Sequence, residues 1–204
     1  MKKTLLIVFA MLLACGAYAQ FPSEVWHDGE LVLVNGDTLK GQIKYNLETD
    51  LVQFSDDKKT IKTYTARKLL HFEIFDKTSN RYRRFYVLPY NLSGNYNAPI
   101  IFELVLEGRK LTLLSREAVE YQVANYPYAV AGSYTRLILV YTHYFLTDEG
   151  EIIKFVGKKK DLLRGVMSRK SSEIKKFIKT NRIRVDSRPD LIKTVAYYNS
   201  LFEE

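Results

Sequence analysis

Hydrophobic and polar residues alternate along much of the first three quarters of the chain. In residues 38–45, Leu39, Ile43 and Tyr45 share one side of an extended chain, while mostly polar side chains share the other. A repeat of two residues is typical of a β-strand with one buried face. The segment is therefore predicted to be a half-buried strand.

A turn signal precedes this strand. Residues 30–34 form a second strand-like run, and Asn35-Gly36-Asp37 separates the two. Asn-Gly between two strands favours a type I′ hairpin turn, which needs a positive φ angle at both central residues. The sequence therefore predicts a β-hairpin with a type I′ turn at this position.

Similar strand pairs around short polar turns recur along the chain to residue 156. They are residues 51–55 with 60–65, 71–75 with 81–88, 99–106 with 110–114, and 135–146 with 152–156. Closely spaced strands joined by short turns favour antiparallel neighbours. We expect a mainly antiparallel β-sheet body, barrel-like or a sandwich, over residues 20–156.

The hydrophobic period changes in the last quarter of the chain. Residues 158–168 and 172–180 carry apolar side chains at helical spacing, and a third stripe consists of Leu191, Val195, Tyr198 and Phe202. The fold class predicted for the whole chain is therefore α+β. The β-rich body is followed by a cluster of about three short α-helices over residues 157–204, packed on the body.

Residues that favour helix starts precede two of these helices. Ser171 or Ser172 is suited to cap the second helix. Ser187 is suited to cap the third, with Pro189 in its first turn and Asp190 three residues after the serine.

The charge is distributed unevenly along the 204 residues, which carry a net charge of +8. Residues 20–150 contain 15 Lys and Arg against 16 Asp and Glu, whereas residues 151–204 contain 14 against 7. The basic residues therefore concentrate in the predicted helical segment. A solvated cationic helix face is one interpretation, and contact with an anionic membrane surface is the alternative.

The N-terminus has the three regions of a secretory signal peptide. Lys2 and Lys3 precede an apolar stretch at residues 5–13, and Ala17-Tyr18-Ala19 gives the small-x-small cleavage pattern. We expect residues 1–19 to be removed after Ala19, which places the protein in the periplasm or outside the cell.

A second processing route involves the single cysteine of the chain. Leu12-Leu13-Ala14-Cys15 resembles a lipobox, so the alternative is a lipoprotein anchored through Cys15. With cleavage after Ala19 the remaining chain has no cysteine, so neither a disulfide framework nor a thiol nucleophile is expected.

Motifs with known chemistry are lacking in the sequence. His27, His71 and His143 fall in different predicted elements and lack the spacing of metal ligands, and there is no nucleophile elbow or glycine-rich phosphate loop. We therefore assign no catalytic residue, metal or cofactor. A hydrolase with a carboxylate-based site is the enzymatic alternative.

One strand interleaves cations with aromatic rings. Strand alternation puts Arg81 and Arg83 on one face, and Tyr82, Arg84 and Tyr86 on the other. These five residues either mark a strand that enters the core from solvent or form a binding surface for anions such as envelope glycans or lipid headgroups. Export makes nucleic acid an unexpected partner.

Several longer runs carry a family resemblance. The runs WHDGELVLVNGDTLKGQIKYNLETDLVQF, HFEIFD and RYRRFYVLPY resemble a family of uncharacterised exported proteins of Bacteroidota-type bacteria. The tail from GEIIKFVGKKKDLL to LIKTVAYYNSLF is similar to a segment that recurs near the ends of other exported proteins from those bacteria. The resemblance implies a periplasmic or envelope-associated protein, and it brings no catalytic or binding residues with it.

Taken together, these patterns predict a non-enzymatic binding or structural module of the cell envelope. The expected partner is an envelope protein, a glycan or an anionic lipid surface. The alternatives are the carboxylate-based hydrolase and a membrane-surface protein that uses its basic C-terminal helices.

Overall fold

The computed structural model describes most of the chain beyond the predicted signal peptide. The described residues are 21–57, 59–92, 96–125 and 133–203. Residues 1–19, with the expected cleavage after Ala19 and the alternative lipidation at Cys15, lie outside them. Among the described residues, no helix combines the length and the apolar character needed to cross a membrane.

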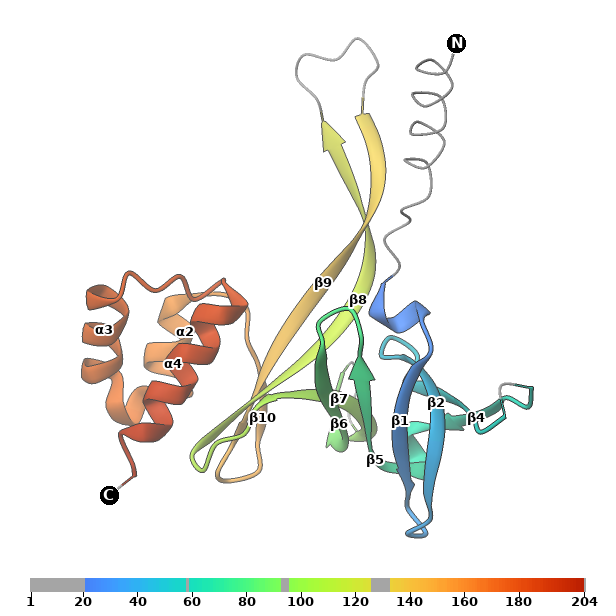
Figure 1. Cartoon of the computed structure of the whole chain (residues 1–204). Helices are drawn as coiled ribbons and strands as arrows, with labels where there is room; N and C mark the ends of the chain where they lie inside the picture. Colours follow the sequence, from blue (N-terminus) through green and yellow to red (C-terminus); the bar gives the residue numbers. More distant parts are fainter. Residues whose placement is uncertain (1–20, 58, 93–95, 126–132, 204) are drawn as a thin grey trace, which may run out of the picture.

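In the described part of the chain, ten antiparallel strands form one continuous sheet, followed by helices (Figure 1). The fold is α+β, as the sequence predicts. The spatial order is β10-β9-β8-β7-β6-β5-β1-β2-β3-β4, so most neighbours in the sheet are also neighbours in sequence. The strands are β1 (His27–Leu33), β2 (Thr38–Asn46), β3 (Leu51–Ser55), β4 (Lys62–Thr65), β5 (Leu69–Asp76), β6 (Arg81–Tyr90), β7 (Ala98–Leu106), β8 (Leu111–Asn125), β9 (Ser133–Thr147) and β10 (Ile152–Lys154).

The first hairpin forms where the sequence predicts it, but its turn differs in type. Within residues 33–38 only Gly36 has a positive φ angle, of 90°. The Leu33 N–H donates to the Asp37 carbonyl and the Gly36 N–H donates to the Leu33 carbonyl, both at 2.9 Å. The loop therefore has three residues, Val34, Asn35 and Gly36, which form a type I turn closed by a glycine bulge. The type I′ prediction is wrong because Val34 belongs to the loop and Asn35 does not adopt a positive φ angle.

Strands β8 and β9 are much longer than their neighbours. They pair over their full length, from Leu111 opposite Thr147 to Asn125 opposite Ser133. Strand β7 pairs with β8 only as far as Ser115. The outer half of the β8–β9 hairpin, residues 116–125 and 133–142, therefore projects as a two-stranded ribbon, which we call the arm (Figure 1).

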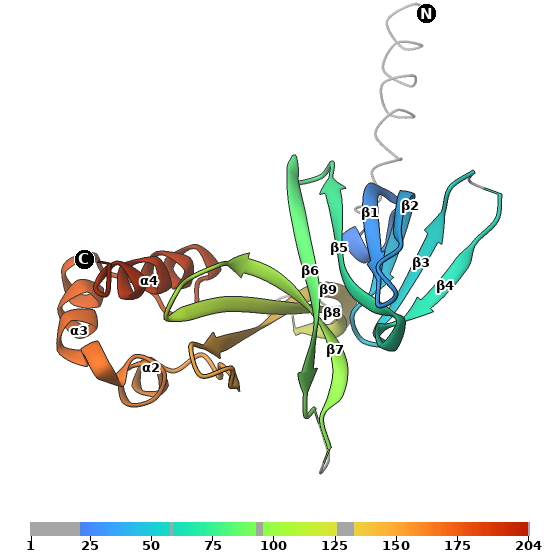
Figure 2. The ribbon, with the colours of Figure 1, turned by 90° about the horizontal axis from the view of Figure 1, so that it is seen from below.

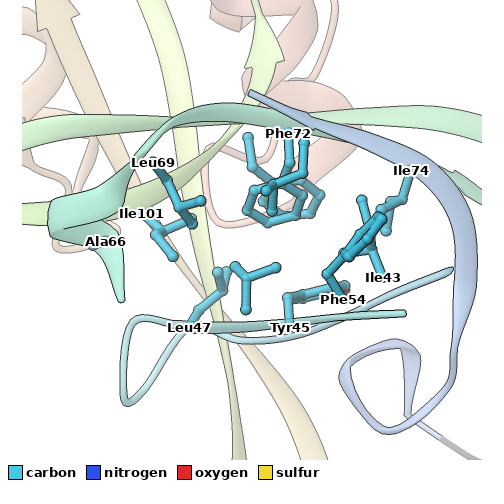
Figure 3. Packing of buried hydrophobic residues seen from close by; sticks show 12 residues of the cluster. Ile43, Tyr45, Leu47, Phe54, Ala66, Leu69, Phe72, Ile74 and Ile101 are labelled. Carbon is cyan, nitrogen blue, oxygen red and sulfur yellow. The ribbon is translucent and has the colours of Figure 1, made fainter. Parts of the chain in front are cut away.

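The sheet curls back on itself, so that β2 and β3 face β6 and β7 across the main core. Phe72 stacks on Phe85 with ring centroids 4.5 Å apart, and Tyr45 lies 4.9 Å from Phe85. Leu47 and Ile101, which belong to opposite sides of the curl, are both buried in this core (Figure 3). The expected barrel-like body corresponds to this curl of a single sheet.

The helices form a second core at the end of the molecule opposite β1 to β4 (Figure 2). They are α2 (Lys159–Arg164), α3 (Ser171–Thr180) and α4 (Arg188–Ser200). Apolar residues of α2, α3 and α4 pack against the bases of β8 and β9. The fully buried members include Leu113, Phe145, Leu162, Ile174, Leu191 and Val195.

The predicted helix caps are only partly correct. Helix α3 begins at Ser171 with Lys170 before it, and no side chain caps it. Ser187 does occupy the capping position of α4, but its side chain makes no capping hydrogen bond. The Asp190 carboxylate instead accepts a hydrogen bond from the Arg184 N–H at 3.0 Å.

A single amide side chain connects α4 to the turn between β7 and β8. The Oδ1 atom of Asn199 accepts the N–H groups of Lys110 at 2.9 Å and Leu111 at 3.0 Å, and its Nδ2 donates to the Leu111 carbonyl at 2.8 Å. Asn199 is only 7% exposed. Its partners are backbone groups that water barely reaches, so the hydrogen bonding of these groups depends on the Asn199 side chain.

We therefore expect Asn199→Ala to lower the free energy of unfolding by about 1–3 kcal/mol, because buried backbone groups lose their partners. Urea denaturation measures the loss. The matched control is Ser200→Ala, which removes an exposed hydrogen bond to the Tyr197 carbonyl. Equal stability of the two variants would contradict the role given to Asn199.

Candidate functional site

A buried ionic cluster lies on the inner face of the curled sheet, where β2, β6, β7 and β8 meet. Arg83, which is 3% exposed, donates to Glu103 from Nε at 3.0 Å and from Nη2 at 2.9 Å. Its Nη2 also donates to Glu117 at 2.8 Å and its Nη1 to the Tyr45 hydroxyl at 2.7 Å. The Tyr45 hydroxyl donates to Glu117 at 2.6 Å, which closes the network.

Helix α4 joins this network through its first residue. Arg188 Nη2 donates to the Oε1 atom of Glu103 at 3.1 Å, and its guanidinium lies 4.8 Å above the ring of Tyr141. We call Tyr45, Arg83, Glu103, Glu117 and Arg188 the Arg83 cluster.

Electrostatics fix the ionisation of the Arg83 cluster. Burial by itself raises the pKa of Glu103, but attraction to Arg83, their hydrogen bonds and the further cations Arg188 and Arg81 outweigh it, so this pKa lies below its ordinary value. Burial raises the pKa of Tyr45 far above its ordinary value. Tyr45 therefore stays neutral and acts as a donor, while Glu103 stays an anion.

A second, partly buried ion pair holds the base of the arm. Arg116 on β8 lies 2.7 Å from the Asp50 carboxylate, and it also donates to the carbonyls of Leu47 and Ile101. Asp50 has a φ angle of 52° and accepts the Ile101 N–H at 2.8 Å. The β2–β3 turn is thereby fastened to β7 and β8.

The structure separates the five binding residues that the sequence singles out. Arg83 lies inside the Arg83 cluster, and Arg81 is half exposed with its guanidinium 3.6 Å from Glu103. Tyr82 is 69% exposed and Arg84 is exposed, on the opposite face from Arg83, with Tyr86 half-buried beside His71. Anion binding by the exposed members stays a prediction, and Arg83 has no solvent-facing group to contribute.

The three histidines lie in three different places. His27 is buried, with Nε2 2.7 Å from the Pro22 carbonyl, and His71 stacks against Tyr86. The Nδ1 atom of His143 is buried and has no hydrogen-bond partner among the described residues. Within the same residues, no group of three His, Cys, Asp or Glu side chains is arranged to hold a metal.

A cleft of about 520 Å³ lies between the short 3₁₀ helix η1 (Pro22–Glu24), the β2–β3 turn and the base of the arm. Three carboxylates line it, as the hydrolase alternative requires. Each is occupied: Glu117 by Arg83 and Tyr45, Glu48 by the Val119 N–H at 3.0 Å, and Glu24 by the Phe21 N–H. The carboxylates serve as structural acceptors, which disfavours a general acid and base pair here.

The arm presents two faces of different chemistry. One face carries Val119, Tyr121 and Val123 of β8 with Leu137 and Leu139 of β9, which the strand pairing places side by side. We call these five residues the apolar stripe; Tyr121 is 78% exposed, Val123 60% and Leu137 44%. The opposite face is mixed: its outer part carries Glu120 and Arg136, which is hydrogen-bonded to Gln122, beside the apolar Ala118, Ile138 and Val140.

The backbone N–H and C=O groups of the stripe residues point sideways, away from the other strand of the ribbon. The Val119 N–H donates outward to Glu48, and the His143 carbonyl accepts outward from Phe155 at 2.9 Å. Alternate residues of an antiparallel strand share this direction, so Tyr121 on β8 and Leu137, Leu139 and Tyr141 on β9 face outward too. No backbone partner contacts them in the described part of the chain.

A second cleft, of about 570 Å³, opens along the free edge of β9. Residues 139–143 of β9 form one wall, and residues 154–157 and 185–188 form the other. Arg188, Tyr141 and His143 therefore border both this cleft and the buried interior. Burial, with repulsion from Arg188, lowers the pKa of His143 to about 4, so its ring is neutral at pH 7.

Comparisons with protein-family models, with curated proteins and with solved structures gave no match. The site is therefore interpreted from its geometry and chemistry.

Sequence reasoning missed Glu103, Glu117 and Arg188, and it missed the outer half of β8. A signal was present, because Glu103 stands inside the apolar run Ile100 to Leu106, where a charge needs a buried partner. The identity of that partner depends on the curl of the sheet, which no local pattern reveals.

Replacing Arg83 by methionine tests the Arg83 cluster. Arg83→Met leaves Glu103 and Glu117 buried without their shared cation, so we expect unfolding to become easier by about 3–5 kcal/mol. Arg84→Met, on the exposed face of the same strand, is the control and is expected to stay within about 0.5 kcal/mol of the parent. A comparable denaturation midpoint for both variants would show that the cluster contributes little.

His143 gives the protein a defined pH dependence. A lowered pKa in the folded state means that the unfolded chain takes up the proton first, so stability is lost as the pH falls from 6.5 towards about 4. We expect His143→Phe to flatten the stability curve between pH 6.5 and about 5, above the range in which carboxylates titrate. Urea titrations across that range measure the slope, and an unchanged slope would refute the assignment.

Proposed function

We propose that the protein is a non-enzymatic binding module of the bacterial cell envelope that docks a partner protein through the arm. The observation that carries this proposal is the apolar stripe, which is exposed at Tyr121, Val123 and Leu137 on a ribbon whose β9 edge has no backbone partner among the described residues.

The apolar character of the stripe has no structural use within the described chain. Lower on the same sheet face, Leu111, Leu113 and Phe145 are covered by the helices. Beyond Tyr141 the face is left uncovered, although Tyr121 and Leu137 continue the apolar pattern. An isolated two-stranded ribbon is marginally stable in water, and a partner that covers this face would stabilise it.

The base of the arm is built to hold it in one orientation. Arg116 ties the start of the arm to Asp50, and Glu117 ties it to Tyr45 and Arg83. A surface that is positioned before binding loses less conformational freedom on association, which favours affinity. These anchors support a recognition role for the arm.

The envelope location in the proposal rests on the sequence. Residues 1–19 have the pattern of a signal peptide, and the longer runs resemble exported proteins of Bacteroidota-type bacteria. Among the partners expected from the sequence, a protein fits the stripe best, because the stripe carries no charge with which to hold a glycan or an anionic lipid.

Charge placed on the stripe tests the proposal. We expect Tyr121→Lys combined with Leu137→Lys to reduce partner capture about tenfold or more, because two buried contacts are replaced by solvated cations. The measurement is crosslinking in the intact envelope from a photoreactive residue at position 123, followed by identification of the captured protein.

Glu120→Lys is the matched control, because it changes the charge by the same two units at an exposed position on the opposite face of the same ribbon. It should leave capture intact, and thermal unfolding should show that both variants fold. Equal capture by both variants would remove the stripe from consideration.

A further inference from the structure

The cleft along β9 combines three features: a free backbone edge, cationic side chains and an apolar neighbour. The edge is formed by the outward-facing groups of Leu137, Leu139 and Tyr141. The cations are Arg188 and Lys154.

The free edge begins where β10 leaves the sheet. Strand β10 pairs with β9 only as far as Lys154 opposite Tyr144, and the Phe155 N–H makes one more hydrogen bond, to His143. Gly157, with a φ angle of 81°, then lies where the chain turns towards α2. From Tyr141 outward the same edge of β9 that pairs with β10 is left open.

Arg188 is held in place and still has donors to offer. Its Nη2 is fixed by Glu103 and its plane by the ring of Tyr141. No acceptor contacts its Nε or Nη1 in the described residues, and its side chain is 18% exposed. A guanidinium with fixed orientation and unused donors is suited to a carboxylate.

The charge around the cleft is positive. Lys154 is exposed and makes no ion pair within the described chain, and His143 is neutral at pH 7. The acidic lining residue, Asp186, is exposed and pairs with Arg184 at 3.3 Å. The open side of the cleft therefore complements a negative group rather than a positive one.

We propose that this cleft binds an extended acidic segment of the partner protein, which adds to the free edge of β9 as a further strand. Backbone hydrogen bonds to residues 137, 139 and 141 supply affinity, and an acidic side chain on Arg188 and Lys154 supplies specificity. Alternate apolar side chains of the added strand lie beside Leu137 and Leu139. This inference rests on the proposed function, because it names the chemistry of the protein that the arm docks.

The test uses the purified protein, expressed from the full-length chain, and two labelled peptides of alternating Val and Thr. One peptide ends in two Glu residues and the other in two Lys residues. We expect the acidic peptide to bind more tightly by fluorescence anisotropy, and Lys154→Glu to weaken it about tenfold. Lys176→Glu, the same charge reversal on the exposed face of α3, is expected to leave affinity unchanged.

Residue-resolved hydrogen exchange locates the peptide without any substitution. The acidic peptide should slow exchange of the amides of Leu137, Leu139 and Tyr141, and leave the amide of Tyr121 on the other edge unchanged. Equal affinity for the two peptides, absence of binding by both, or slowed exchange only at Tyr121 would each overturn the inference.

Crosslinking in the intact envelope separates this inference from the proposed function. If Lys154→Glu captures the partner as well as the parent while the stripe variant does not, the proposed function stands and the inference about the cleft fails. If the stripe variant also captures the partner, the proposed function itself fails.

Discussion

The position of Arg83 governs much of this structure. One guanidinium, removed from water, satisfies two carboxylates and a phenol from three other strands, and through Glu103 it also meets the first residue of α4. These contacts are possible only when the sheet curls far enough for β2 to reach β8. A buried charge tolerates few alternative arrangements, because each unmatched one leaves an ion without a partner. The cluster thus specifies the curl, whereas the apolar core supplies most of the driving force for folding.

The same interaction connects the two hydrophobic cores. The main core lies on the Tyr45 side of the Arg83 cluster, and the core under the helices begins beyond Arg188. Apart from the cluster, the sheet and the helical end are joined by the hydrogen bonds of Asn199 and by apolar packing against β7 and the bases of β8 and β9. The arm rises from the middle of this polar region, so its orientation is coupled to both cores through Glu117 and Tyr141.

The sequence predicted the fold class and most elements because these depend on local patterns. Alternation located the strands up to β7, and the helical stripe through Leu191, Val195 and Tyr198 is buried in α4. The prediction of β8 ended near residue 114, because the polar pair Arg116 and Glu117 follows, and both turn out to be buried partners of distant residues. Long-range pairing of this kind is set by tertiary structure. Local sequence patterns therefore could not predict the Arg83 cluster or the clefts. Arg83, in contrast, was selected from the sequence for a surface role, and the face to which alternation assigned it is the interior.

The contact between Glu48 and the Val119 amide makes the two edges of the arm unequal. A ribbon that is open on both sides can grow in both directions, since each added strand exposes a fresh template, and polymers are the usual result. Here a carboxylate from the β2–β3 turn occupies the β8 edge at its root, so a long strand can be accommodated only on the β9 side. Two copies of this chain that pair through their β9 edges therefore keep no second open edge at the base of either arm. The arm thus keeps one exposed β-edge while limiting the self-assembly that such edges usually cause.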